Sequence, residues 1–476
     1  MIRIIRNFTL MNVFVLQRQL LGLWTLLAFG VCLISPARGN DSKPNIVLIL
    51  SDDQTWTDYG FMGHDVIRTP HLDRLAEESV LYLRGYVPTP LCRPSLMSLV
   101  TGHYAKDHGV TGNDPSPRLA DRDSPEAVGL AKELITNIDR FDALPEILVR
   151  NGYLTHQSGK WWEGNHTRGG FTHGMTEGQP GGRTRHGDKG LTIGREGLEP
   201  IYDFIEEAED QEKPFYLWYA PFLPHTPHNP PQRLLSYYEK MNLDPVVAKY
   251  YAMCEWFDET CGELIGHLEA KGLRENTIIY YVCDNGWIQK SADTKVPEGW
   301  FTSFAPKSKQ SVYDGGIRTP IMFSWPGIIE PDIRGDLVSS IDTFPTVLSA
   351  AGIEVPDGLP GVDLWSSIQS GSSIGRDAIF GDCYAHDIAD LDEPEASLMY
   401  LWCIQDRWKL ILTYDGEVNR YQIVHPRKDP IQLFDIVSDP HETRNLADQY
   451  PQVAARLKER IEDWYPLTQR KLVSGQ

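Results

Sequence analysis

Short apolar runs that end in polar residues recur along the chain. The run Pro44–Leu50 is followed at once by Ser51-Asp52-Asp53. Continuous apolar runs of this length are typical of parallel strands that are buried on both faces. Two further runs have the same form, residues 214–220 before Pro224-His225 and residues 277–283 before Asp284-Asn285-Gly286. Because the carboxyl ends of parallel strands meet at one edge of an open α/β sheet, we expect these polar groups to share one crevice.

Helical patterns lie between these strands. The spacing of apolar residues and the terminal signals predict helices over 71–79, 144–150 and 343–351. Alternation of strands and helices predicts an α/β fold. From about Asp377 the pattern changes to short strands over 398–404, 408–413 and 432–436, followed by a helix over 452–464. We therefore expect a catalytic domain over residues 40–376 and a smaller C-terminal subdomain over residues 377–476.

The first 39 residues differ from the rest of the chain. Basic residues precede an apolar run over 20–34, and Ala37-Arg38-Gly39 offers small residues for cleavage. A membrane anchor is the competing interpretation, but the run is shorter than the roughly 20 apolar residues that span a bilayer. The pattern favours a signal peptide over residues 1–39, no later membrane span, and export to the periplasm or the extracellular space.

Charge and cysteine content exclude several classes of protein. The chain has 45 basic and 65 acidic residues among 476, a net charge of -20, so a general nucleic-acid binder is not expected. An anionic substrate remains compatible if cations and a metal gather at one cleft. Seven cysteines in so long a chain do not form a disulfide scaffold. Cys32 would leave with the signal peptide, and the five cysteines besides Cys92 cannot all pair, so buried thiols are the simplest expectation.

Cys92 stands at the predicted start of a helix. Pro94 suits the first helical turn and Gly102 suits its end. Free amides and the helix dipole at this end attract anions and would lower the pKa of a thiol. A thiolate nucleophile of the cysteine-phosphatase kind is disfavoured, because Ser98 occupies the position where such a loop places its arginine. A buried structural cysteine is the default for a lone Cys.

The segment around Cys92 resembles the maturation signature of the sulfatases, in which Cys-x-Pro-Ser-Arg precedes a helix ending in Thr-Gly. Other segments follow in the family's order: Asp52-Asp53, residues 69–76, Gly159-Lys160-Trp161, Pro224-His225-Thr226-Pro227, Asp284-Asn285-Gly286, Lys309, residues 313–320, 433–435 and 439–446. The resemblance implies an alkaline-phosphatase-like fold, with a large, mostly parallel central sheet flanked by helices and a smaller C-terminal α+β subdomain with a short antiparallel sheet. It also implies a sulfuric ester hydrolase.

The candidate metal ligands are Asp52, Asp53, Asp284 and Asn285. This all-oxygen set with three carboxylates suits a hard divalent cation, and calcium in particular because it accepts flexible geometry. The resemblance also favours one Ca²⁺, with the modified Cys92 beside it. Helix capping explains a pair of aspartates after a strand, and a tight turn explains Asp-Asn-Gly, when either motif stands alone. Their combination with Cys92 favours the metal.

The resemblance further implies the chemistry. Cys92 would be oxidised to formylglycine by a maturation enzyme, and one hydroxyl of the hydrated aldehyde would attack sulfur while an alcohol leaves. The second hydroxyl would then expel sulfate. Lys160, His225 and Lys309 match family positions that bind the sulfate oxygens or protonate the leaving group. The expected partner is a sulfate ester of a small molecule or a carbohydrate.

Two positions depart from the family pattern. Leu96 replaces the arginine that closes the maturation signature, and Trp162 replaces the histidine two residues after the lysine. Arg93, His103 and His108 are candidates to compensate. These departures leave open a catalytically silent binder of sulfated ligands, and the shared scaffold leaves open a phosphodiester or phosphonate ester hydrolase.

The stretch between Trp161 and Arg195 is rich in Gly, His and Arg and fits no regular element. Long irregular segments in compact domains are often functional. A substrate-binding loop and an ordinary solvated loop are both compatible with this composition.

Overall fold

The computed structural model describes residues 43–115, 124–178, 189–190, 192–287, 307–418 and 429–474. The predicted signal peptide and residues 179–188 of the Gly-, His- and Arg-rich stretch lie outside these ranges. Within them, no helix combines the length and apolar character that crossing a membrane requires.

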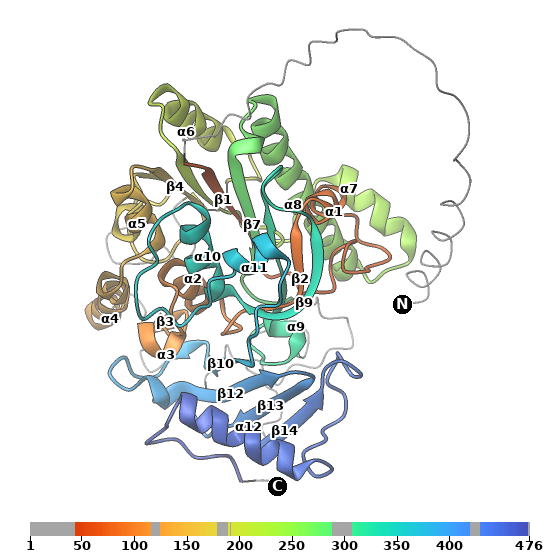
Figure 1. The fold of residues 1–476 in the computed structure, drawn as a ribbon. Helices are drawn as coiled ribbons and strands as arrows, with labels where there is room; N and C mark the ends of the chain where they lie inside the picture. The colour runs from red at the N-terminus through yellow and green to blue at the C-terminus, as the bar shows by residue number, and fades with distance from the viewer. Residues whose placement is uncertain are drawn as a thin grey trace, which may run out of the picture. The chain divides into compact units, whose positions relative to one another are not determined.

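An eight-stranded sheet forms the centre of the larger part of the fold (Figure 1). Its strand order is β5-β4-β6-β1-β7-β8-β2-β9, and all neighbours are parallel except the two pairs that β8 makes with β7 and β2. The strands are β1 (Asn45–Ser51), β2 (Val80–Tyr86), β4 (Leu154–Gly159), β5 (His173–Gly174), β6 (Phe215–Ala220), β7 (Thr277–Cys283), β8 (Arg318–Ser324) and β9 (Asp332–Ser339). The prediction of a mostly parallel sheet is confirmed.

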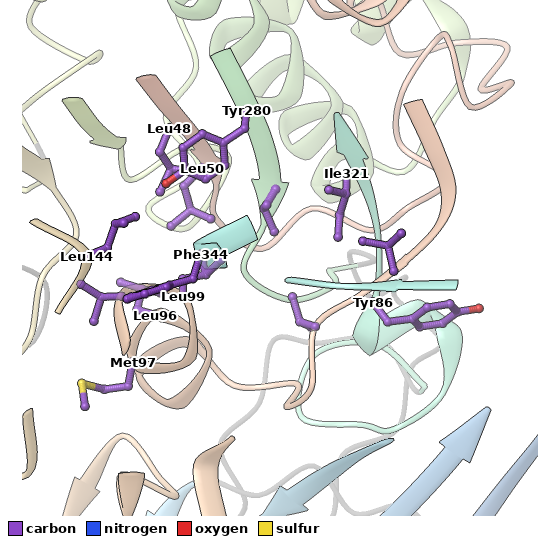
Figure 2. Close-up of a cluster of buried hydrophobic side chains, with 14 of the residues drawn as sticks. Leu48, Leu50, Tyr86, Leu96, Met97, Leu99, Leu144, Tyr280, Ile321 and Phe344 are labelled. Atoms are coloured by element: carbon purple, nitrogen blue, oxygen red, sulfur yellow. The ribbon is translucent and has the colours of Figure 1, made fainter. Parts of the chain in front are cut away.

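Helices cover both faces of this sheet. Ile46, Leu48 and Leu50 of β1 belong to a core shared with α2, α5 and α10, whereas Val47 and Ile49 belong to a core shared with α1, α6 and α8. Figure 2 shows Leu48 and Leu50 in the first of these cores, with Leu96, Leu99 and Phe344. Because successive side chains of a strand point to opposite faces, a strand covered on both faces must be apolar throughout.

The helices vary widely in length. They are α1 (Pro70–Glu77), α2 (Cys92–Thr101), α3 (Ala105–His108), α4 (Pro125–Ile135), α5 (Leu144–Arg150), α6 (Glu199–Asp210), α7 (Gln232–Tyr238), α8 (Pro245–Ala270), α9 (Asp314–Ile317), α10 (Thr343–Ala350), α11 (Trp365–Ser370) and α12 (Pro451–Trp464). The three predicted helices of the catalytic domain correspond to α1, α5 and α10, and the predicted closing helix corresponds to α12.

A four-stranded antiparallel sheet follows towards the C-terminus. Its order is β10-β12-β13-β14, formed by β10 (Ala378–Tyr384), β12 (Leu398–Gln405), β13 (Trp408–Thr413) and β14 (Ile431–Asp435). Trp402 and Ile404 of β12 pack into the core that β1 shares with α2. Leu401 and Cys403 pack into a third core, which the C-terminal sheet shares with α12. The antiparallel C-terminal sheet is therefore confirmed, and the domain boundary between residues 376 and 377 remains a prediction.

Candidate active site

The acidic residues after β1 and β7 lie side by side because the two strands are paired in register, with Ser51 opposite Cys283. The backbone N–H of Asp284 donates to the Ser51 carbonyl at 3.0 Å, and the backbone N–H of Asp53 donates to Asp284 Oδ1 at 3.1 Å. Asp53 has a φ of 64°, a left-handed conformation that Asp tolerates better than most residues. The chain therefore turns at the strand end and directs both acids into the same space.

Lys160 enters this space from the end of β4. Gly159 has a φ of 83°, and a Cβ on it would lie 2.0 Å from the Ala220 carbonyl oxygen, so only glycine fits there. The Lys160 side chain is fully buried, and its Nζ lies 2.6 Å from Asp52 Oδ1 and 2.9 Å from Asp284 Oδ2. Burial of an ammonium group requires such paired carboxylates.

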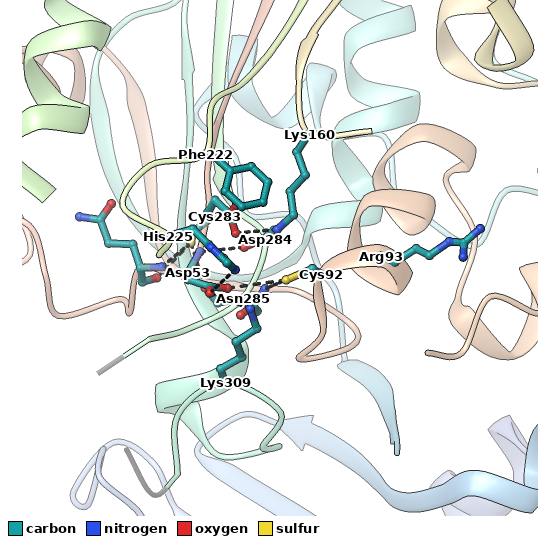
Figure 3. Close-up of polar contacts among 12 residues, drawn as sticks. Asp53, Cys92, Arg93, Lys160, Phe222, His225, Cys283, Asp284, Asn285 and Lys309 are labelled. Carbon is teal, nitrogen blue, oxygen red and sulfur yellow. Dashed lines mark hydrogen bonds and ion pairs between the residues drawn. The ribbon is translucent and has the colours of Figure 1, made fainter. Parts of the chain in front are cut away.

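Cys92 occupies the first position of α2, as predicted, and its side chain is 1% exposed. Its Sγ lies 3.7 Å from Asp53 Oδ1 and 3.5 Å from Asn285 Nδ2 (Figure 3). Leu91 before it is extended, and Gly102 ends the helix in the left-handed conformation. The sulfur of Cys92 thus faces the acidic residues at the carboxyl end of the sheet.

Lys309 and His225 reach the same carboxylate. Lys309 Nζ lies 2.6 Å from Asp53 Oδ2, and His225 Nε2 lies 3.3 Å from the same oxygen. His225 Nδ1 lies 2.6 Å from the Thr226 carbonyl oxygen. Both ring nitrogens therefore face oxygen atoms, an arrangement in which each can donate a proton when the ring is charged.

The acidic cluster has the properties of a metal site. Ligand atoms of Asp52, Asp53, Cys92 and Asp284 all lie within 4.8 Å of one another, and all four residues are buried. Asp52 Oδ2 and Asn285 Oδ1 are buried without a hydrogen-bond partner among the described residues. Buried oxygens are normally satisfied, so two unsatisfied oxygens next to three carboxylates fit a bound cation. The structure brings together all the metal ligands and catalytic residues predicted from the sequence.

The charge states within the cluster follow from burial and from the neighbouring charges. Burial raises the pKa of the Cys92 thiol to about 12, against a smaller opposing effect of Lys160 and Lys309. The expectation that the helix dipole lowers this pKa is therefore wrong, and the thiol stays protonated at neutral pH. Burial acts to lower the pKa of Lys160, but Asp284 and Asp52 outweigh it and raise that pKa well above its usual value. Burial, then Lys309 and Lys160, lower the pKa of His225 well below its usual value.

None of the three residues considered as substitutes for the missing arginine contacts Cys92 through a side-chain hydrogen bond or ion pair. The Arg93 side chain extends away from the cluster and forms a two-pronged ion pair with Glu163, with Nε to Oε1 and Nη2 to Oε2 both at 2.7 Å (Figure 3). His108 Nε2 lies 3.2 Å from Ser98 Oγ, and His103 Nδ1 lies 2.8 Å from the Thr101 carbonyl oxygen. Leu96 itself lies in the core on the α2 side of the sheet.

Aromatic rings surround the two lysines, a feature that the sequence did not indicate. Lys160 Nζ lies 5.7 Å from the ring centre of Trp162 and 5.5 Å from that of Phe222, and Lys309 Nζ lies 5.9 Å from that of Trp287. Aromatic faces attract cations at these distances. Trp162 thus supplies a cation–π contact to Lys160 at the position where the family pattern has histidine.

Comparison with known families decides the assignment. The family model described as Sulfatase matches residues 44–353, which is more than half of the chain. This chain belongs to the sulfatase family. A second model, described as N-sulphoglucosamine sulphohydrolase, C-terminal, matches residues 299–465 of this sulfatase. The enzyme class predicted from the sequence, sulfuric ester hydrolase, is thereby supported.

Named relatives agree with the family, and solved structures agree with the fold. The chain is 27% identical to arylsulfatase A of Bos taurus over 91% of its length and 88% of that protein, and 26% identical to N-acetylgalactosamine-6-sulfatase of Mus musculus over 92% and 89%. The structure of Ps i-CgsB in complex with k-i-k-neocarrahexaose has a TM-score of 0.66 at 22% identity, covering 89% of this chain and 93% of that one. Phosphonate monoester hydrolase of Agrobacterium radiobacter has a TM-score of 0.64 at 20% identity, covering 90% and 97%. These solved structures share the alkaline-phosphatase-like fold.

Proposed function

We propose that this sulfatase hydrolyses a sulfate ester of a carbohydrate, using a formylglycine derived from Cys92 and one bound Ca²⁺. The observation that carries the proposal is the position of Cys92, whose Sγ faces a cluster of three buried carboxylates with two unsatisfied oxygens. A structural cysteine needs no such neighbours.

The metal would be held by Asp52, Asp53, Asp284 and Asn285, with the modified side chain of residue 92 beside it. Four oxygen-donating side chains on two adjoining loops suit calcium, which accepts irregular oxygen coordination. When bound, the cation would polarise a sulfate oxygen and favour the ionised form of a nucleophilic hydroxyl. The hydrated aldehyde at position 92 would supply that hydroxyl.

Lys160 and Lys309 would bind the non-bridging sulfate oxygens. Both ammonium groups are fixed by carboxylates and lie on either side of Cys92, where negative charge develops during sulfuryl transfer. His225 would hold a proton at Nε2 for the departing alcohol, while its Nδ1–H donates to the Thr226 carbonyl. A sulfate bound between the lysines would offset their positive charge and so favour the protonated ring.

Support for a sulfated carbohydrate as substrate comes from the relatives. One is named for a sulfated amino sugar, and one solved structure of the same fold holds a carrageenan-type oligosaccharide. Export to the periplasm or the extracellular space is part of the same proposal and depends on cleavage of the predicted signal peptide at residues 1–39. A maturation enzyme that generates formylglycine is the corresponding protein partner.

Mass spectrometry of the peptide that contains Cys92, from protein made in its native host, tests the proposed nucleophile. We expect the mass of the aldehyde or its hydrate, and complete retention of the thiol would refute the proposal. Turnover of aryl sulfate by the same preparation should exceed turnover of aryl phosphodiesters and phosphonate esters. A reversed preference would favour the phosphonate hydrolase alternative, and tight binding of a sulfated glycan without turnover would favour a silent binder.

A further inference from the structure

The segment that carries His225 has few backbone N–H groups that could donate hydrogen bonds to its own carbonyl groups. Residues 221–231 include five prolines, at positions 221, 224, 227, 230 and 231. Proline has no N–H to donate, so this segment cannot form a regular ladder of backbone hydrogen bonds. Its carbonyl groups nevertheless need donors, because buried carbonyls are normally paired.

Arg195 provides those donors from a distant part of the chain. Its Nη2 donates to the carbonyl oxygens of Phe222 at 2.6 Å and His225 at 2.9 Å. Its Nη1 donates to the carbonyl oxygen of Pro227 at 3.2 Å and to Oδ1 of Asn229. One guanidinium group thus contacts the proline-rich segment at four points. They lie three residues before His225, at His225, and two and four residues after it.

The turn that carries Arg195 is itself firmly anchored. Ile193 and Leu198 are buried in the core with Leu223, and the N–H of Gly194 donates to the Gly197 carbonyl at 2.9 Å. The Arg195 guanidinium carbon lies 5.6 Å from the ring centre of Trp256 on α8. Among the described residues Arg195 forms no ion pair, and its four acceptors are three backbone carbonyl oxygens and the side-chain amide oxygen of Asn229.

We propose that Arg195 is a positioning residue for His225, which holds His225 Nε2 at its place beside Asp53 Oδ2. The proposal depends on the function proposed above, in which His225 protonates the leaving alcohol. The planar fork of arginine presents donors in fixed directions, whereas the ammonium of lysine is a single point of charge. Only arginine can therefore reach all four acceptors at once.

The distinguishing readout is the dependence of kcat on the leaving group. Proton donation matters for a poor leaving group, such as a sugar alcohol, and little for an acidic phenol that departs as its anion. We expect His225→Ala to lower kcat for a sulfated sugar by about 10²-fold or more, with a much smaller effect on nitrophenyl sulfate. Arg195→Ala should reproduce this selectivity with a loss of about 10- to 100-fold, as expected for a displaced catalytic group. The double variant should be no worse than His225→Ala alone.

Two further variants complete the experiment. Arg195→Lys keeps the charge but not the fork, so it should keep most of the defect of Arg195→Ala. Arg233→Ala is the matched control, because Arg233 forms a two-pronged contact with Glu259 on the exposed surface of α7 and α8, and its kcat values should equal those of the wild type. The ratio of the two substrates within one preparation does not depend on the fraction of folded protein.

Each outcome has a definite meaning. If the wild type hydrolyses no sulfate ester, the proposed function fails before Arg195 is tested. If the wild type is active but Arg195→Ala lowers kcat equally for both substrates, or adds fully to His225→Ala, the positioning role is refuted. Full recovery of the wild-type ratio in Arg195→Lys would also refute it, because charge alone would then suffice.

Discussion

Two buried clusters of this sulfatase are built from the same residue types and differ in how completely their oxygens are paired. In the active site, Lys160 and Lys309 face Asp52, Asp53 and Asp284. At the junction with the C-terminal sheet, Lys409 of β13 lies 2.9 Å from Asp314 Oδ1 and 2.8 Å from Glu442 Oε1, and all three side chains are almost completely buried. Both clusters therefore contain buried lysine–carboxylate ion pairs of similar length.

The pairing of the remaining oxygens distinguishes them. In the junction cluster, Glu442 Oε2 accepts from the N–H of Asp314, and Asp314 Oδ2 accepts from Tyr86 Oη at 3.2 Å. Glu442 Oε1 accepts no hydrogen bond among the described residues, but it is ion-paired with Lys409. In the active site, Asp52 Oδ2 and Asn285 Oδ1 have no hydrogen-bond partner among the described residues. Oxygens that are all hydrogen-bonded or ion-paired fix structure, whereas buried oxygens with neither kind of partner mark a place for a ligand. Burial and charge alone would not have separated the proposed metal site from a structural ion-pair cluster.

The largest expected effect is the loss of activity when the active-site cluster is altered at Cys92. Cys92→Ala removes the proposed precursor of the nucleophile, so kcat for an aryl sulfate should fall by at least about 10³-fold. Relative to the chain with an unmodified thiol at position 92, the free energy of unfolding should change by no more than about 1 kcal/mol, because Cys92 Sγ has only long, weak polar contacts. Steady-state kinetics and urea unfolding measure the two quantities, and substantial residual turnover would exclude Cys92 from the mechanism.

The junction cluster should show the opposite response. Lys409→Met leaves Glu442 buried without its ion-pair partner and leaves Asp314 with only the longer 3.4 Å contact to Arg318, so the free energy of unfolding should fall by about 3–5 kcal/mol. The folded fraction should keep its kcat within a small factor, since Lys409 does not contact the active-site carboxylates. Chemical denaturation with an activity assay at matched folded fractions checks both statements. An unchanged denaturation midpoint would show that the cluster contributes no stability.

The smallest effect concerns pH. Burial raises the pKa of Glu442 from 4.5 to about 7, against the opposing effect of Lys409. The folded state therefore binds this proton more tightly than the unfolded state, and the resulting stability is present below pH 4.5 and is lost as the pH rises towards 7.

Glu442→Gln removes this contribution, so its free energy of unfolding should fall less steeply with rising pH than that of the wild type. The difference should be about 2–3 kcal/mol across this interval. Other buried acids with a raised pKa, such as Asp258 and Asp382, are present in both proteins, so the difference isolates Glu442. Parallel curves for the two proteins would contradict the assignment.

Local sequence patterns predicted those helices and strands whose own residues show a continuous apolar run or a helical spacing of apolar residues. The strands β1, β6 and β7 are continuous apolar runs, and α5 and β13 coincide with the predicted residues. The sequence of β4, LTHQSG, is polar although all six residues are buried, so the strand that delivers Lys160 had no apolar signal. Its polar side chains pair within the strand, as His156 Nδ1 does with Ser158 Oγ, or with Thr172 and Thr176, so they are satisfied without an apolar pattern.

The same limit applies to the site. The proximity of Asp52, Asp53, Asp284 and Asn285 could be predicted because strand ends in a parallel sheet converge, and the place of Cys92 at the start of α2 because Pro94 and Gly102 mark that helix. Their roles as metal ligands and as precursor of the nucleophile remain proposals. The thiol pKa was mispredicted because the helix dipole is visible in the sequence and burial is not. Arg195 was missed as a functional residue because its four acceptors lie 27 to 34 positions away. Hydrogen bonds between residues so far apart in the sequence can be recognised only in the folded chain.

The metal content of purified protein tests the central claim most directly. Elemental mass spectrometry should find one Ca²⁺ per wild-type chain, and Asp284→Asn should lose it, because one ligand of the cation then has no charge. Glu442→Gln, which removes a carboxylate from the junction cluster, should keep it. Equal calcium in wild type and Asp284→Asn, or equal loss in both variants, would contradict the account.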